Sequence, residues 1–363
     1  MAMKCYDYNP NLFRNAQGKD WQLWRSIYNI FGSAATNIDR TGIIKSPVSS
    51  IVPKQLELPT YDDNFSLSYK DCCSLRVLEL VESQDKLNVP IKLMYSGGID
   101  SSLILASFID TIGVAETARR LEIVLSQESI QENPWMWTKF IRPHFKILNS
   151  ENFKNHLTTD AITTTGELND QILGADIYRA VVGWAGDGVL NKLHNSDLIT
   201  GFMSHRGMTS EEIDCWYSLL STMVSKAPCP ITTVGDWWSW IAFTCKCSSV
   251  YFRLFKTIPE GFPLDENYLN TYYQLFYCND NFQKWSMKNR SQKHQGNFIT
   301  WKFHARELIA SITNTPEYLT KVKRGSLNEI TKITKTYSVL DENYQPHYNF
   351  NIEDWYDPKN SFN

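Results

Sequence analysis

The chain has 363 residues and a formal net charge of −3, with 42% hydrophobic and 21% charged residues. This length is enough for about two domains, and the composition is that of a globular protein, which excludes collagen-like and wholly disordered chains. The near-neutral charge also argues against a protein that coats nucleic acid through bulk electrostatic attraction.

The sequence contains no run of about 20 apolar residues, the length that a membrane-spanning helix needs. No apolar run follows Lys4, so the N-terminal residues do not resemble a secretory signal. We therefore expect a cytoplasmic protein with no membrane partner. The eight cysteines include no C-x-x-C spacing, and we expect scattered thiols rather than a disulfide framework or a zinc ribbon.

Residues 1–85 are rich in polar and aromatic side chains, and we expect them to form a helical and irregular N-terminal extension. Apolar residues at a spacing of three to four predict helices over residues 20–31 and 68–82.

Strands and helices are predicted to alternate over residues 86–200. Apolar or β-branched runs predict strands at residues 91–95, 121–125, 145–148 and 160–165. Helical patterns lie between and after these runs, at residues 101–112, 134–140 and from 168 toward 178. We therefore expect an α/β domain, with a twisted parallel sheet flanked by helices.

Residues 201–336 are predicted to be mainly helical and to complete the site, with helices near residues 211–224, 237–255, 267–280 and 301–313. Three tryptophans in this part are expected in the core or in an interface rather than in a cofactor site: Trp237, Trp238 and Trp240. Residues 337–363 are rich in Asn, Asp and Tyr without a convincing period, and we expect a C-terminal tail.

The most informative segment has the sequence M-Y-S-G-G-I-D-S-S and lies between a predicted strand and a predicted helix. Two glycines allow a tight turn that brings backbone N–H groups close to a ligand, and the helix directs its positive N-terminus to the same place. Asp100 would repel bare phosphate, so we expect a divalent cation between the carboxylate and the phosphate. The predicted phosphate site comprises Ser96, Gly97, Gly98, Ile99, Asp100, Ser101 and Ser102.

This segment matches S-G-G-x-D-S, and the chain therefore resembles the ATP pyrophosphatase (PP-loop) superfamily. The resemblance implies the fold of the adenine nucleotide alpha hydrolases, with ATP and Mg²⁺ as cofactors. It also implies that ATP is cleaved between its α and β phosphates and that the loop holds the released pyrophosphate. A Gly-Gly turn in an unrelated α/β protein is the alternative interpretation.

A second segment, T-G-E-L-N-D-Q-I-L-G, resembles the S-G-E-G-x-D-E-x-F-G-G segment of asparagine synthetase. The resemblance implies that Thr165 and Gly166 line the nucleotide and that Glu167 contacts the intermediate. It also implies that Asp170 shares the metal with Asp100, as a Mg²⁺–pyrophosphate site requires two carboxylates.

The second segment departs from the family pattern at three positions. Leu168 and Ala175 stand where the family has glycines, and Gln171 stands where it has glutamate. The alternative interpretation is an ordinary helix start with acidic residues near its N-terminus. A further candidate, Ser126, follows a predicted strand, and its position at the carboxyl edge of a parallel sheet predicts a place near adenine.

Residues 284–324 contain nine Lys or Arg and two acidic residues. In asparagine synthetase and its β-lactam-forming relatives, a lysine in a basic loop after the last helices reaches the pyrophosphate, and the resemblance implies this role for Lys323, with Lys321 next. Replacing Lys323 with Ala would then preserve ATP binding and lower turnover on the order of a few hundredfold. A solvated basic face, or a nucleic-acid patch with Trp285 and Trp301, are the alternatives.

The resemblance covers residues 86–330, the synthetase half alone. The segment before the glycine loop is too short for the family's N-terminal glutaminase domain, and position 2 is Ala rather than Cys. We expect an ATP-dependent ligase that adenylates a small-molecule acid or a peptide and forms an amide with an amine or with ammonia, from an ammonia source or a separate amidotransferase. The alternatives are adenylation of a base carbonyl in a nucleotide or nucleic acid, which is less favoured, and a degenerate nucleotide-binding protein without activity.

Overall fold

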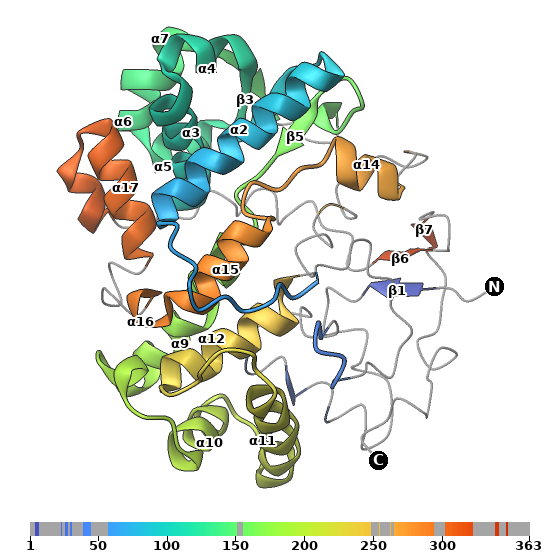
Figure 1. Cartoon of the computed structure of the whole chain (residues 1–363), viewed down its shortest axis with the longest axis vertical. Helices are drawn as coiled ribbons and strands as arrows, with labels where there is room; N and C mark the ends of the chain where they lie inside the picture. The colour runs from blue at the N-terminus through green and yellow to red at the C-terminus, as the bar shows by residue number, and fades with distance from the viewer. Residues whose placement is uncertain are drawn as a thin grey trace. The chain divides into compact units, whose positions relative to one another are not determined.

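The computed structural model describes residues 57–150, 155–247, 265–293 and 302–321, residues 23, 26, 27, 30, 39–44, 254 and 262, and the backbone of three short strands. The chain forms two compact units (Figure 1). The sheet unit comprises Asp62–Ile172 and Glu266–Ile333, and the helical unit comprises Met1–Tyr61, Leu173–Asp265 and Thr334–Asn363. The predicted segments 86–200 and 201–336 are therefore each divided between the two units.

The sheet unit is built around four parallel strands in the order β4-β3-β2-β5. The strands are β2 (Ile91–Met94), β3 (Leu121–Leu125), β4 (Lys146–Asn149) and β5 (Ile162–Thr164). Helices flank this sheet (Figure 1), so the predicted α/β class is confirmed. β3 and β4 lie to one side of β2 while β5 lies to the other, so the strand order reverses between β2 and β5.

Helices of the sheet unit follow or precede these strands. Their bounds are α2 (Tyr69–Leu87), α3 (Ile99–Ile112), α4 (Val114–Arg120), α5 (Gln127–Glu132), α6 (Pro134–Met136), α7 (Arg142–His144), α8 (Asn169–Ile172), α14 (Glu266–Thr271), α15 (Asp280–Lys288), α16 (Arg290–Lys293) and α17 (Phe303–Thr313). Trp137–Ile141 forms a π-helical turn and Pro316–Thr320 a 3-10 turn. Helix α3 packs against both α2 and α17, and most of its residues are buried.

The single helix predicted over residues 267–280 is wrong. Helix α14 ends at Thr271, and the chain then runs beside β5, where Thr163 donates to the Tyr272 carbonyl (2.7 Å) and Gln274 donates to the Thr163 carbonyl (2.9 Å). These bonds satisfy backbone groups that a continuous helix would have paired internally. Asn279 then caps α15 by accepting from the Phe282 N–H.

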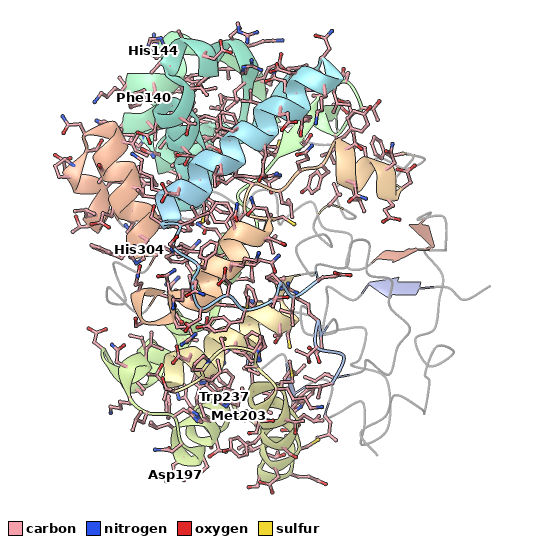
Figure 2. The ribbon with its side chains drawn as sticks, viewed as in Figure 1. Phe140, His144, Asp197, Met203, Trp237 and His304 are labelled. Atoms are coloured by element: carbon pink, nitrogen blue, oxygen red, sulfur yellow. The ribbon has the colours of Figure 1, made fainter. Side chains whose placement is uncertain are left out.

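The helical unit is built from α9 (Ala175–Ala185), α10 (Ser196–His205), α11 (Ser210–Ser225) and α12 (Val234–Cys245). Every residue of α12 is buried, and Trp237 and Met203 lie among the helices of this unit (Figure 2). Trp237, Trp238 and Trp240 are all buried, so of the two predicted places, core or interface, the structure shows the core. Helix α12 ends ten residues before the predicted end at residue 255, although residues 248–253 lie outside the described part.

Three short strands form a separate antiparallel sheet in the order β1-β6-β7. They are β1 (Lys4–Tyr6), β6 (Ser338–Leu340) and β7 (Pro346–His347). β6 and β7 fall in residues 337–363, the segment expected to be a C-terminal tail because it lacks a convincing period. Of the helix predicted over residues 20–31, only residues 23, 26, 27 and 30 are described, and they are helical and buried.

Among the described residues, no single helix is long and apolar enough to cross a membrane. The pair α3 and α4, bent by 119° between them, passes the same test of length and composition together.

Candidate phosphate and metal site

The glycine turn connects β2 to α3. Gly97 adopts a φ of +72°, and a Cβ atom there would lie 2.3 Å from the Ser129 carbonyl oxygen and 2.9 Å from the Glu132 Cβ. Gly98 is the N-cap of α3, with an extended backbone and no side-chain cap. The N–H groups in the first turn of a helix have no partner within it, so the turn and the helix together present backbone donors.

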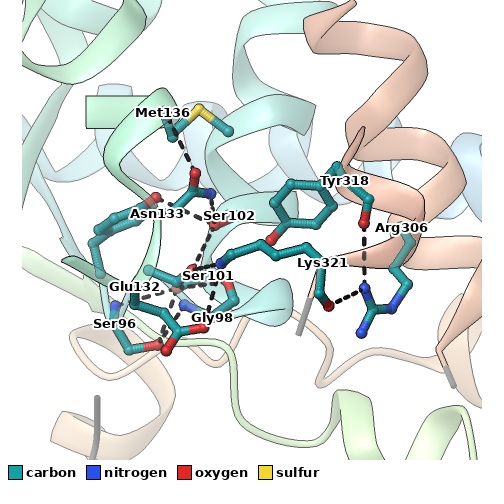
Figure 3. Close-up of polar contacts among 12 residues, drawn as sticks. Ser96, Gly98, Ser101, Ser102, Glu132, Asn133, Met136, Arg306, Tyr318 and Lys321 are labelled. Carbon is teal, nitrogen blue, oxygen red and sulfur yellow. Dashed lines mark hydrogen bonds and ion pairs between the residues drawn. The ribbon is translucent and has the colours of Figure 1, made fainter. Parts of the chain in front are cut away.

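Serine hydroxyls surround this turn (Figure 3). The Ser96 hydroxyl accepts from the Gly98 N–H at 3.3 Å and lies 3.2 Å from the Ser101 hydroxyl. Asn133 donates to the Ser102 hydroxyl at 3.1 Å. The structure therefore places all three predicted serines at the turn.

Two acidic residues predicted as metal ligands contact one lysine. Asp100 lies in the first turn of α3, and Asp170 lies in the first turn of α8. The Lys302 ammonium is 2.7 Å from both carboxylate oxygens of Asp100 and 2.5 Å from Asp170 Oδ1. Asn169 donates to Asp100 Oδ1 at 2.7 Å and accepts from the Tyr69 hydroxyl. The starts of the two helices that follow adjacent strands thus meet at Lys302.

Gly166 allows the two loops to approach. A Cβ atom at this position would lie 2.8 Å from the Asp100 Cβ and 3.1 Å from the Ser101 nitrogen. The backbone of residue 166 therefore packs directly against the start of α3. The Tyr277 hydroxyl donates to the Asp100 carbonyl at 2.9 Å and links the returning segment of the chain to the same place.

Burial and charge act in opposite directions on the ionisable groups of this cluster. Burial raises the pKa of Asp100, which Lys302 opposes and the Asp170 carboxylate reinforces. Burial by itself would lower the pKa of Lys302, but the two carboxylates outweigh burial and raise it. Lys302 is therefore a cation at neutral pH.

A second lysine reaches the glycine turn (Figure 3). The Lys321 ammonium lies 3.4 Å from the Gly97 carbonyl oxygen and 3.3 Å from Glu132 Oε1. The buried Arg306 guanidinium holds this segment in place by donating to the carbonyls of Lys321 (2.7 Å) and Tyr318 (3.2 Å). Lys321 therefore lies beside the glycine turn, and its role at the pyrophosphate stays a prediction. Lys323, the first choice for that role, lies outside the described residues.

The remaining predicted residues also follow strand ends. Ser126 follows β3, and its hydroxyl caps α5 by accepting from the Ser129 N–H. Thr165 is buried after β5, and its hydroxyl accepts from the Glu167 N–H at 3.3 Å. Glu167 itself is partly exposed. The predicted roles of Ser126 near adenine and of Glu167 at the intermediate therefore rest on their places after the strand ends.

Sequence reasoning missed Lys302, Asn169, Glu132 and Arg306. Lys302 and Arg306 belong to the basic stretch 284–324, but the pattern of that stretch did not distinguish them from its other cations. Glu132 lies seven residues after the end of β3, at the end of α5 and next to the buried Asn133, and a buried acid in such a place is a usable signal for a site.

Leu168 adopts a φ of +77°, although a leucine pays about 1–2 kcal/mol in the left-handed region. It occupies the position where the asparagine synthetase segment has glycine, and its side chain is buried. A glycine would therefore adopt the backbone conformation observed here without that strain.

Leu168→Gly is accordingly expected to be at least as stable as Leu168→Ala, because both lose the buried side chain but only glycine relieves the backbone. Leu103 in the middle of α3 supplies the control, since glycine there should be about 1 kcal/mol less stable than alanine. Urea unfolding of the four variants measures both differences. The same alanine-over-glycine preference at both positions would contradict the strain at Leu168.

Among the described residues, no group of three or more His, Cys, Asp or Glu side chains is arranged to hold a metal ion. The two carboxylates on Lys302 nevertheless suit Mg²⁺, which binds through one or two carboxylates and completes its shell with phosphate and water oxygens. Comparison of the sequence with protein-family models found no matching family, and comparison with curated proteins found no match.

Proposed function

We propose that this chain is an ATP-dependent synthetase of the PP-loop type, with the fold of the adenine nucleotide alpha hydrolases. The observation that carries the proposal is the convergence of Asp100 and Asp170 on one cation beside the glycine turn. Ligands of open α/β sheets bind at the carboxyl ends of the strands where the strand order reverses. That reversal lies between β2 and β5, and the two carboxylates follow these two strands.

The proposed reaction has two steps. A carboxylate oxygen of the acceptor bonds to the α-phosphorus of ATP, and the bond from that phosphorus to the bridging oxygen breaks with pyrophosphate leaving. An amine or ammonia then attacks the acyl carbon, loses a proton and displaces AMP. The product is an amide, as in asparagine synthetase, and the acceptor is a small acid or a peptide.

The residues of the turn have separate parts in the first step. The backbone N–H groups of the turn and of the first turn of α3 bind the leaving pyrophosphate, with the hydroxyls of Ser96, Ser101 and Ser102. Mg²⁺, when bound at Asp100 and Asp170, would neutralise charge on the phosphate oxygens. Lys321 supplies a cation next to the Gly97 carbonyl, where negative charge develops as pyrophosphate leaves.

Exchange of [³²P]pyrophosphate into ATP tests the proposal, with Mg²⁺ and panels of amino acids, small acids, peptides, nucleotides and nucleic acids. Acceptor-dependent exchange with a small acid or a peptide is the expected result, and EDTA should abolish it. Exchange only with a polynucleotide would favour adenylation of a base carbonyl instead. Absence of both exchange and ATP binding would overturn the proposal.

A matched pair of variants locates the exchange activity. Asp170→Asn should lower exchange on the order of a hundredfold or more, because it removes one of the two carboxylates. Asp85→Asn is the control, since Asp85 pairs with Arg120 just before β3 and therefore lies at the opposite end of the strands. Equal exchange in the two variants would separate the activity from this site.

A further inference from the structure

Lys302 reaches the cluster under two unfavourable conditions. Its side chain is 3% exposed, so a full positive charge is buried. Its backbone has φ 60° and ψ 38°, the left-handed conformation that residues other than glycine rarely adopt. A strained residue persists only where the surroundings hold it in place, and such residues gather at functional sites.

The contacts of Lys302 offset its buried charge and its strained backbone. Its ammonium touches both oxygens of Asp100 and one oxygen of Asp170, all at 2.5–2.7 Å. The Asp100 side chain is 18% exposed and the Asp170 side chain 37% exposed, so water screens their charges only in part. Two carboxylates held this close repel each other unless a cation lies between them. Lys302 therefore supplies the positive charge that this pair needs in a protein without ligand.

The ammonium also lies between the carboxylates, at the position that a metal ion bound to both would take. Mg²⁺ binds carboxylate oxygens at about 2.0–2.1 Å, closer than Lys302 does. A metal ion on the same oxygens would have to displace the ammonium from this position, and the two cations would repel each other at short range. The phosphates of ATP carry the additional negative charge that would hold the displaced ammonium nearby.

We infer that Lys302 is the resident cation of the nucleotide-free site, so that a divalent metal ion binds there only together with the phosphates of a nucleotide. This inference rests on the proposed ATP-dependent function and adds an order of binding to it. Without nucleotide, Lys302 neutralises the charge of the two carboxylates, and it prevents a free metal ion from binding to them alone. When metal and nucleotide arrive together, the ammonium moves from the carboxylates toward the phosphates.

Binding of Mn²⁺ to the protein without nucleotide tests the inference, measured by electron paramagnetic resonance of the free ion. The wild type and Lys302→Arg, which keeps the charge, should bind no Mn²⁺ at this site at submillimolar concentrations. Lys302→Met should bind one Mn²⁺ at least tenfold more tightly than the wild type. Adding Asp170→Asn to Lys302→Met should abolish that binding, which assigns the ion to this pair of carboxylates.

Two outcomes would overturn the inference. One is tight binding of Mn²⁺ by the nucleotide-free wild type that Asp170→Asn removes, a measurement that does not depend on the folding of any Lys302 variant. The other is a folded Lys302→Met chain that binds Mn²⁺ no better than the wild type. The proposed function is judged separately by binding of ATP to the wild type, so that its failure is distinguishable from a wrong role for Lys302.

If Lys302→Met does not fold, water-proton relaxation with α,β-methylene-ATP decides the matter on the wild type. A protein-bound Mn²⁺ that appears only with the nucleotide analogue, and that Asp170→Asn removes, supports the inference. The same relaxation enhancement without the analogue contradicts it.

Discussion

Gly97→Ala is expected to lower the free energy of unfolding by about 2–5 kcal/mol and to abolish nucleotide binding. The added methyl would lie 2.3 Å from the Ser129 carbonyl oxygen, which is a backbone atom of α5 and cannot rotate away. The residue would also retain a φ of +72°. Left-handed strain and the repulsion of an overpacked contact add to each other, and both act within the turn that binds phosphate.

Gly98→Ala is the matched control for this substitution. Its φ is −70°, and the nearest atom to an added Cβ is the Ser96 hydroxyl oxygen at 3.2 Å, the end of a side chain. We expect its unfolding free energy to stay within about 1 kcal/mol of the wild type. Urea unfolding and fluorescence binding of a labelled ATP compare the two variants. Equal stability of the two would show that the Gly97 contact is not rigid.

Asp100→Asn is expected to lower pyrophosphate exchange by roughly 100- to 1,000-fold and yet to make the folded chain more stable at neutral pH. The substitution removes a largely buried carboxylate whose ionised form is disfavoured by burial and by Asp170, while Lys302 keeps its contact with Asp170. Loss of activity accompanied by a gain in stability is typical of residues retained for function.

The pH dependence of this gain has a definite sign. Because the pKa of Asp100 is raised on folding, the folded state binds its proton more tightly than the unfolded state does. The cost of the ionised carboxylate is therefore absent below about pH 4, the ordinary pKa of Asp, and develops as the pH rises through the folded value. Urea unfolding of the wild type and of Asp100→Asn at pH 3.5 and 7.5 measures this cost as the difference between their unfolding free energies. A gain that is larger at the lower pH would contradict the direction of the shift.

The strands of the sheet could be predicted from the sequence to within two residues, because strands buried in a parallel sheet appear as short apolar runs. The meeting of Asp100 and Asp170 was also predictable in outline. Each follows a predicted strand, and the carboxyl ends of parallel strands share one edge of the sheet.

The lysine between them was not predictable from a single sequence. Lys302 lies 202 positions from Asp100, and no local pattern records a contact at that distance. Its position also depends on the return of the chain beside β5 at residues 272–276, where tertiary hydrogen bonds replaced the helix that the sequence pattern favoured. Glu132 lies seven residues past the end of β3, beyond the strand-end position that Ser126 occupies, so the strand-end pattern does not extend to it.

The division of the sheet unit into two stretches of sequence has a consequence during synthesis on the ribosome. The nascent chain completes the glycine turn and both carboxylates with Asp62–Ile172, but the cation that compensates them follows only after the segment Leu173–Asp265. At about 5–20 residues per second, the 202 positions between Asp100 and Lys302 correspond to roughly 10–40 s of translation. Until then, water has to solvate the two carboxylates at this edge of the sheet. The edge becomes buried only late, when the segment that carries Lys302 packs onto it.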